Sequence, residues 1–279
     1  MSEFESADFS GTETGKVERE GLPPGYRMRA DAHYVDSLSG ASRADRGRES
    51  GRANAGDPIA RPGATNPRLL DQLSEDVAAI ESAAALLTSD KSALMRRVGL
   101  DLIKAQATRA SWLLRANALL AGGETDDNAR RRPLGEILAQ VRERAGVECR
   151  LMGVGLELHV TPEAARVPQP ETTVAAGVTG LVLAQLGLCT GTEGALIRIQ
   201  AGLNPGEIGA ISIDVSQDAT PLPSGGLGRF FDADWVTRPG GWLAAVGAAT
   251  ARAAADRLDG SATVVTTERR GCKVNLGLP

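Results

Sequence analysis

Histidine and cysteine, whose side chains serve as nucleophiles, metal ligands or proton carriers near neutral pH, are few in this chain and lie far apart in the sequence. The histidines, whose imidazoles exchange protons near neutral pH, are His33 and His159. The cysteines Cys149, Cys189 and Cys272 form neither a CxxC pair nor a Cys/His spacing typical of a zinc site. We therefore expect reduced thiols, no metal and no cofactor in a cytoplasmic protein.

A group of carboxylate, amide and hydroxyl side chains lies in the string LLDQLSEDVAAIESAAALL, residues 69–87: Asp71, Gln72, Ser74, Glu75 and Asp76. Apolar residues of the same string recur at steps of four, three, four and three: Leu73, Val77, Ile80, Ala84 and Leu87. This heptad spacing predicts a helix that packs against other helices and leaves Asp71 off its apolar stripe.

Two long helices are predicted to form an antiparallel hairpin over residues 67–123. The first begins after the potential cap Asn66 and ends near Leu87, and TSDKS then forms a tight turn, with Ser89 or Asp90 as the next cap. The second helix ends at Gly122. Each helix has more apolar face than one hairpin can bury, so we predict a homodimer that forms a four-helix bundle.

An alternating α/β region, residues 133–279, follows a polar linker at 124–132. Hydrophobic patterns predict helices at 133–146, 171–189 and 241–258, and strands at 147–154, 156–160, 195–203 and 209–216. A Gly/Pro-rich loop covers 217–240, and a hairpin of strands at 261–268 and 272–279 closes the sheet. The predicted class is α+β, with helices on one face of a mixed sheet in a two-layer sandwich.

The first 66 residues lack sustained periodicity and are expected to be disordered. Within them, residues 21–38 carry Tyr26, His33 and Tyr34, so this stretch is either a binding motif or a locally collapsed tail. The whole chain has a net charge of −4 and no early apolar segment, which gives no case for nucleic acid or a membrane as partner.

The order of these elements resembles the histidine-kinase family, which has a dimerising helical hairpin followed by an ATPase domain of the gyrase and heat-shock-protein type. Three strings carry the resemblance: DQLSEDVAAIESAAALL, ISIDVSQDATPLP and AVGAATARAAADRLDGSATVVTTERRGCKVNLGLP. The string RPGGWLAAVGAATARAAADRLDG is also similar to the closing helix of kinase-like histidine phosphotransferases. The resemblance covers residues 67–279 and implies the kinase fold.

The residues that align with the family's working groups differ from them. Asp71 stands where the phosphorylated histidine belongs, and a carboxylate cannot replace an imidazole in that role. Gln185 replaces the magnesium-binding Asn, and Gln217 replaces the adenine-binding Asp, with Asp218 one place along. Gly247 alone remains of a glycine-rich phosphate loop. The resemblance therefore implies a degenerate nucleotide site that binds no ATP.

Aromatic residues occupy the place of the family's mobile ATP lid: Phe230, Phe231, Trp235 and Trp242. They either fill the vacated cavity as ordinary core or form a docking surface.

Two signalling functions are consistent with this sequence, and a plain structural dimer with no signalling role is a further alternative. In the first, the chain is a non-catalytic signalling protein that binds a response-regulator receiver domain or a kinase through its bundle. The contact would involve Asp71, Gln72, Glu75 and Asp76, and the tail would bind a further partner in cis or in trans. In the second, the chain is a phosphatase toward the aspartyl phosphate of a receiver, with Gln72 or Ser74 orienting water.

Overall fold

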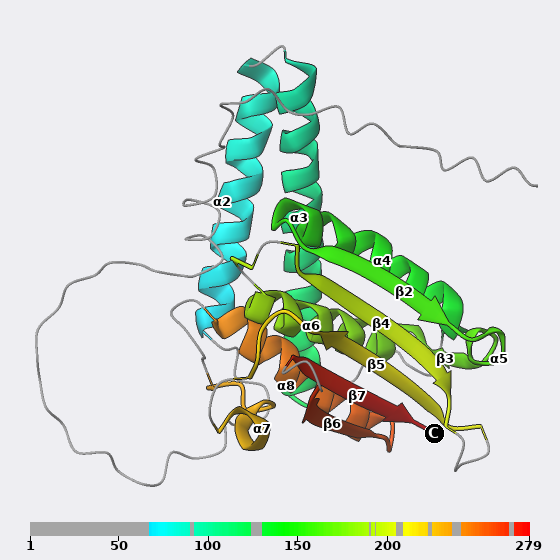
Figure 1. Ribbon diagram of the computed structural model, residues 1–279. Helices are drawn as coiled ribbons and strands as arrows, with labels where there is room; N and C mark the ends of the chain where they lie inside the picture. Colours follow the sequence, from blue (N-terminus) through cyan, green and yellow to red (C-terminus); the bar gives the residue numbers. More distant parts are fainter. Residues whose placement is uncertain are drawn as a thin grey trace, which may run out of the picture.

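The computed structural model describes residues 67–89, 92–123, 130–189, 191–192, 194–204, 209–222, 225–235, 241–267 and 271–279. The predicted tail 1–66, with Tyr26, His33 and Tyr34, and residues 124–129 of the predicted linker lie outside the described residues. Figure 1 shows a long helical hairpin beside a sheet that is covered by helices.

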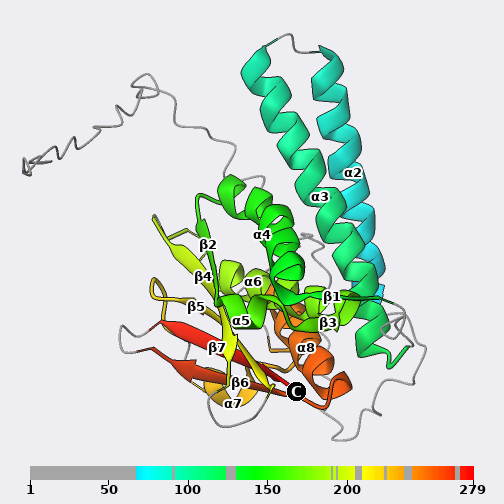
Figure 2. The ribbon, with the colours of Figure 1, turned by 90° about the vertical axis from the view of Figure 1, so that its right-hand side faces the viewer.

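The predicted hairpin is formed by α2 (Pro67–Ser89) and α3 (Ala93–Leu120). The N-cap of α3 is Ser92, not the predicted Ser89 or Asp90, and its side chain makes no capping hydrogen bond. As predicted, α3 stops before Gly122, which has a φ of 67° that a glycine adopts without strain. The end of the hairpin that carries the turn projects away from the sheet in both views (Figures 1 and 2).

Five strands form one mixed sheet in the order β2-β4-β5-β7-β6. Their bounds are Gly155–Val160 (β2), Leu196–Leu203 (β4), Ile211–Gln217 (β5), Ser261–Thr266 (β6) and Cys272–Leu278 (β7). β2 runs parallel to β4, and the other neighbours are antiparallel, including the predicted pairs β4–β5 and β6–β7. The α+β class is confirmed.

Three long helices cover one face of this sheet, as Figure 2 shows: α4 (Leu134–Leu151), α6 (Glu171–Cys189) and α8 (Trp242–Arg257). The short helices are α5 (Pro162–Ala165) and α7 (Gly226–Arg229). The two strands β1 (Arg131–Pro133) and β3 (Pro168–Pro170) pair as a separate ribbon, so the end of the predicted linker is part of the fold.

The strand predicted at residues 147–154 is wrong, because α4 continues through this stretch to Leu151. Its apolar stripe repeats every four residues through Val141, Ala145 and Cys149, all buried in the core. The helix therefore continues the spacing of its first half, and the chain turns only at Gly153, where φ is 69°.

The helix α3 joins the hairpin to the sandwich, because it packs on α4, α6 and α8. The buried side chains of Trp112, Leu113 and Ala116 belong to the same hydrophobic core as the sheet. The indole N–H of Trp112 donates to the carbonyl of Ala176 in α6 at 2.9 Å. Hairpin and sandwich therefore share one core in this arrangement.

By length and composition, α6 is the one helix in the described ranges that could cross a membrane, and 83% of the qualifying window is buried inside the fold. Its buried residues face the sheet and α8. Such burial is typical of the central helix of an α/β core.

Candidate functional site

The polar cluster of α2 is divided between the solvent and the interior of the protein. Asp71, Ser74 and Glu75 are exposed. Gln72 is only 7% exposed and Asp76 is fully buried, so the expectation that these two residues lie on an exposed contact face is wrong. The cause is the helix register, in which Gln72 and Asp76 face α3 while Val77 turns outward, 50% exposed.

A buried ionic cluster, consisting of Asp76, Arg109 and Glu148, joins α2, α3 and α4. The guanidinium of Arg109 donates from Nε to Oδ1 of Asp76 at 3.0 Å and from Nη1 to Oε1 of Glu148 at 3.4 Å. Gln106 accepts a further hydrogen bond from Arg109, and Gln72 donates to Asp76. The three ionic side chains and the two glutamines are each less than 9% exposed. One guanidinium is therefore the only cation that the cluster offers to two buried carboxylates.

This cluster was not predicted, although the sequence contains a signal for it. Arg109 lies between Ala105 and Trp112 at the heptad spacing of the buried stripe of α3, which is a position for an apolar residue. A charged residue at such a position requires a partner, because an isolated buried charge is strongly destabilising. The partners Asp76 and Glu148 come from sequence positions more than 30 residues away.

Burial raises the pKa of the Glu148 carboxyl, against the opposing effect of the Arg109 guanidinium and with the help of the nearby Asp76 carboxylate. The folded protein therefore holds this proton more tightly than the unfolded chain, in which the pKa of Glu is about 4.3. The contribution of Glu148 to stability is present below that value and is lost as pH rises through the raised folded-state pKa.

We expect Glu148→Gln to remove this loss, so that the variant gains stability relative to the wild type as pH rises above about 4.3. Urea unfolding at a series of pH values measures the effect. Glu143→Gln is the matched control, because Glu143 is an exposed residue of the same helix. Equal pH dependence in the two variants would contradict the assignment to Glu148.

Gln217, which the resemblance aligns with the family's adenine-binding Asp, uses its side chain to close the turn after β5. Its Oε1 accepts from the backbone N–H groups of Ala219 and Thr220 at 2.7 and 2.8 Å, and its Nε2 donates to the carbonyl of Thr220 at 2.6 Å. Gln217 is fully buried. Asp218 faces the other way, as predicted, and pairs with Arg198 at 3.1 Å. Both side chains therefore contact other parts of the protein.

Gln185, the local candidate that the resemblance gives for the family's magnesium-binding Asn, is fully buried and connects α6 to the sheet. Its amide donates to the carbonyl of Val215 at 3.2 Å and contacts Cys272 Sγ at 3.5 Å. Its oxygen has no hydrogen-bond partner. Gln185 therefore has a structural role, in which it links α6 to β5 and β7 within the core.

Gly247 lies inside α8, at the crossing of α8 with α6. A Cβ on Gly247 would collide with the carbonyl oxygen of Gly180, and a Cβ on Gly180 would collide with that of Gly247. Both glycines are therefore needed where the two helix backbones touch. This packing role accounts for the glycine that the resemblance assigned to a phosphate loop.

The four aromatic residues that the resemblance aligns with the family's lid belong to the core. This was one of the two expectations for them. Phe230 is 4% exposed, and Phe231, Trp235 and Trp242 pack against the same hydrophobic cluster. The rings of Phe230 and Phe231 meet edge to face at 5.2 Å.

The remaining reactive groups are either inert or remote from the hairpin. Burial raises the pKa of Cys149 to about 12 and that of Cys272 to about 11, so these thiols stay protonated near neutral pH. His159 is an exposed residue of β2 beside Glu157. Residues 67–123 contain no histidine.

No family model matches the chain. No curated protein matches it either. Among solved structures, the fold is similar to the catalytic domain of the histidine kinase ThkA, with 17% identity and a TM-score of 0.45 over 54% of this chain and 95% of that one. It is also similar to the mycobacterial sensor histidine kinase MprB, with 16% identity and a TM-score of 0.44 over 54% of this chain and 96% of that one.

Full-length ShkA, solved in complex with AMPPNP, is similar over 79% of this chain, with 15% identity and a TM-score of 0.49. The match spans 46% of the ShkA chain. Two of these three similar structures, ThkA and MprB, are histidine kinases. At these identities and TM-scores the likeness does not extend to an activity, a nucleotide or a partner.

Proposed function

We propose that this protein is a non-catalytic signalling protein of the histidine-kinase type, which acts in the cytoplasm by binding a receiver domain or a kinase. The observation that carries the proposal is the use of Gln217 and Gly247 for internal contacts at two positions where the family binds nucleotide. The absence of histidine from residues 67–123 further supports a protein that acts by occupancy.

A homodimer is part of the proposal, because each helix of the hairpin leaves a heptad stripe exposed. The stripe of α2 contains Leu70, Val77 and Ala84, and that of α3 contains Leu100, Ala107 and Leu114. The leucines and the valine are 49–60% exposed in the single chain. A second hairpin that covers both stripes completes a four-helix bundle. Light scattering should therefore give the mass of a dimer, and a monomer mass would contradict this arrangement.

The receiver is proposed to bind the exposed side of α2 near Asp71 and Glu75. We expect Glu75→Lys to weaken receiver binding roughly tenfold, because it reverses a charge at the centre of this surface. Titration with a labelled phosphorylated receiver measures the affinity. The matched control is Glu163→Lys on α5, which makes the same exposed charge change on the sandwich. Equal affinities for the two variants would contradict the proposed surface.

The structure gives less support to the phosphatase alternative. The Nε2 of Gln72 donates to the buried Asp76 at 3.2 Å, and the hydroxyl of Ser74 donates to the carbonyl of Leu70 at 3.0 Å. Both groups that could orient a water molecule therefore already have partners. The lifetime of the receiver's aspartyl phosphate should be unchanged by the protein, and accelerated loss that Gln72→Ala abolishes would favour the phosphatase.

A further inference from the structure

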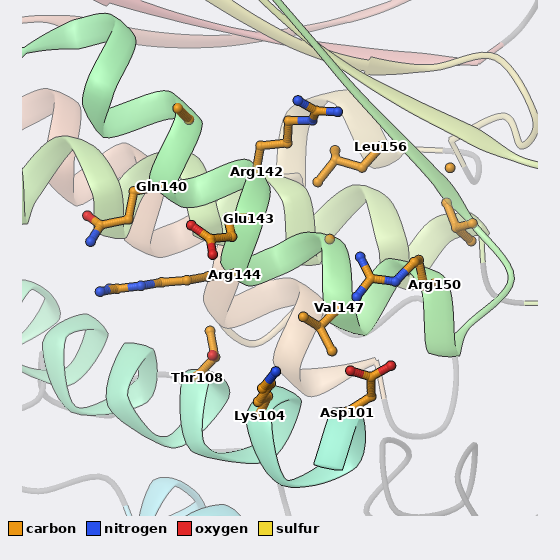
Figure 3. A pocket seen from close by; sticks show the side chains of 14 residues that line it. Asp101, Lys104, Thr108, Gln140, Arg142, Glu143, Arg144, Val147, Arg150 and Leu156 are labelled. Atoms are coloured by element: carbon orange, nitrogen blue, oxygen red, sulfur yellow. The ribbon is translucent and has the colours of Figure 1, made fainter. Parts of the chain in front are cut away.

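A groove between the hairpin and the sandwich carries charge that the proposed function does not use. It has a volume of about 840 Å³ and lies between α3, α4 and the start of β2. Figure 3 shows Lys104 and Thr108 of α3 on one side of it, opposite Glu143 and Arg144 of α4. A smaller hollow of about 250 Å³ shares Thr108, Gln140 and Arg144 with this groove and adds Arg115.

Cations outnumber acids along the joined groove. The basic side chains are Lys104, Arg115, Arg142, Arg144 and Arg150, and the acidic ones are Asp101 and Glu143. Within the described part of the chain, no carboxylate pairs with Lys104, Arg142 or Arg150, and all three are exposed. Cations gathered on facing walls favour an anionic occupant that bridges them.

The dimensions of the groove suit an extended peptide. From Asp101 to Arg115 it follows about 21 Å of α3, at 1.5 Å per residue. An extended segment rises about 3.3 Å per residue, so six or seven residues span this length. Apolar side chains also line the groove, and Val147 and Leu156 are half-buried there. The occupant should therefore combine acids with apolar side chains.

The chain itself contains such a segment. We infer that residues 3–9, EFESADF, dock in the groove between α3 and α4 of the same chain. The segment has three acids (Glu3, Glu5, Asp8), no base, and phenylalanines at both ends of ESAD. Residues 1–20 hold six acids and two bases, whereas residues 21–66 hold seven arginines and five acids. Charge therefore selects the beginning of the chain over the rest of the first 66 residues.

Covalent attachment makes this docking feasible even at low intrinsic affinity. Residues 10–66 connect the segment to α2, and a chain of that length can span on the order of 100 Å or more. A tethered segment acts at an effective concentration of up to about 1 mM, so a contact that is weak between separate molecules is populated within one. Because the groove has walls from both α3 and α4, the docked segment bridges hairpin and sandwich.

Distance measurement between two spin labels in the full chain tests this inference. Labels at Ser6→Cys and Ala139→Cys report on the segment and on an exposed groove residue of α4, while the native cysteines are buried. We expect a population of short label-to-label distances. Arg142→Glu with Arg150→Glu should abolish it, and Glu3→Lys with Asp8→Lys added to that variant should restore it. Salt at about 1 M, where the screening length is about 3 Å, should also deplete it.

The matched control is Arg131→Glu with Arg166→Glu, which makes the same charge change at exposed residues that do not line the groove. It should keep the short distances. The same distance distribution in the wild type and in the groove variant would overturn the inference. So would short distances that vanish when labelled chain is diluted into excess unlabelled chain, because the segment would then come from a second copy.

Discussion

Replacing Arg109 by alanine is expected to lower the free energy of unfolding by about 3–5 kcal/mol, because it leaves two buried carboxylates without their cation. Asp76 is fully buried and Glu148 is 4% exposed, so water cannot take the place of the guanidinium without opening the contact between α2, α3 and α4. One oxygen of Asp76, Oδ2, already lacks a hydrogen-bond partner. Urea unfolding of wild type and variant measures the difference.

The control for this prediction removes the charges together. Arg109→Met combined with Asp76→Leu and Glu148→Met keeps similar volumes and leaves no buried charge of the cluster, so it should be far less destabilising than Arg109→Ala. If Arg109→Ala alone stays within about 0.5 kcal/mol of the wild type, as ordinary surface changes do, the cluster does not hold the three helices together.

Replacing Gly247 by alanine is expected to lower the free energy of unfolding by about 1–3 kcal/mol, the cost of overpacking a tight contact. The added methyl would meet the carbonyl oxygen of Gly180, so α6 and α8 would have to move apart. The expected sign is informative, because alanine in an unhindered helix is favoured over glycine by about 1 kcal/mol.

Gly146→Ala is the matched control, since Gly146 also lies inside a helix but has only the end of Arg150 near a new Cβ, at 3.8 Å. This variant should be stabilised by about 0.5–1 kcal/mol. Thermal or urea unfolding of the two variants compares them directly. If Gly247→Ala instead stabilises the protein, the packing role of Gly247 is contradicted. The glycine would then serve another purpose, such as backbone access to a ligand.

Local pattern was sufficient to predict most elements of the fold. The strands around Ile199, Ile213 and Val274 alternate buried and half-exposed residues, and that period of two is visible in the sequence. The strand prediction failed at residues 147–151, where the spacing of Val141, Ala145 and Cys149 continues a helix. Glu148 in this stretch is charged and nevertheless buried, because Arg109 of α3 pairs with it. The sequence around Glu148 does not reveal this partner.

The candidate site was harder to predict, because its chemistry depends on which residues meet across the fold. The resemblance identified Gln185, Gln217 and Gly247 as altered positions, but only the structure gives each one an internal role: an α6–sheet contact, a turn and a helix crossing. The exposure of Gln72 and Asp76 was wrongly predicted, since a stripe drawn through Val77 and one drawn through Asp76 both have heptad spacing. The two residues are buried because Arg109 faces them.

The most direct test of the proposed non-catalytic function is whether phosphate becomes covalently attached to this chain. The full-length protein is incubated with magnesium and ATP labelled at the γ-phosphate, and the chain is then separated and assayed for label. We expect no incorporation, because the hairpin has no histidine and the altered positions contact the protein itself. Stoichiometric, acid-labile label on the chain would contradict the account, since it would show that phosphoryl transfer persists in this architecture.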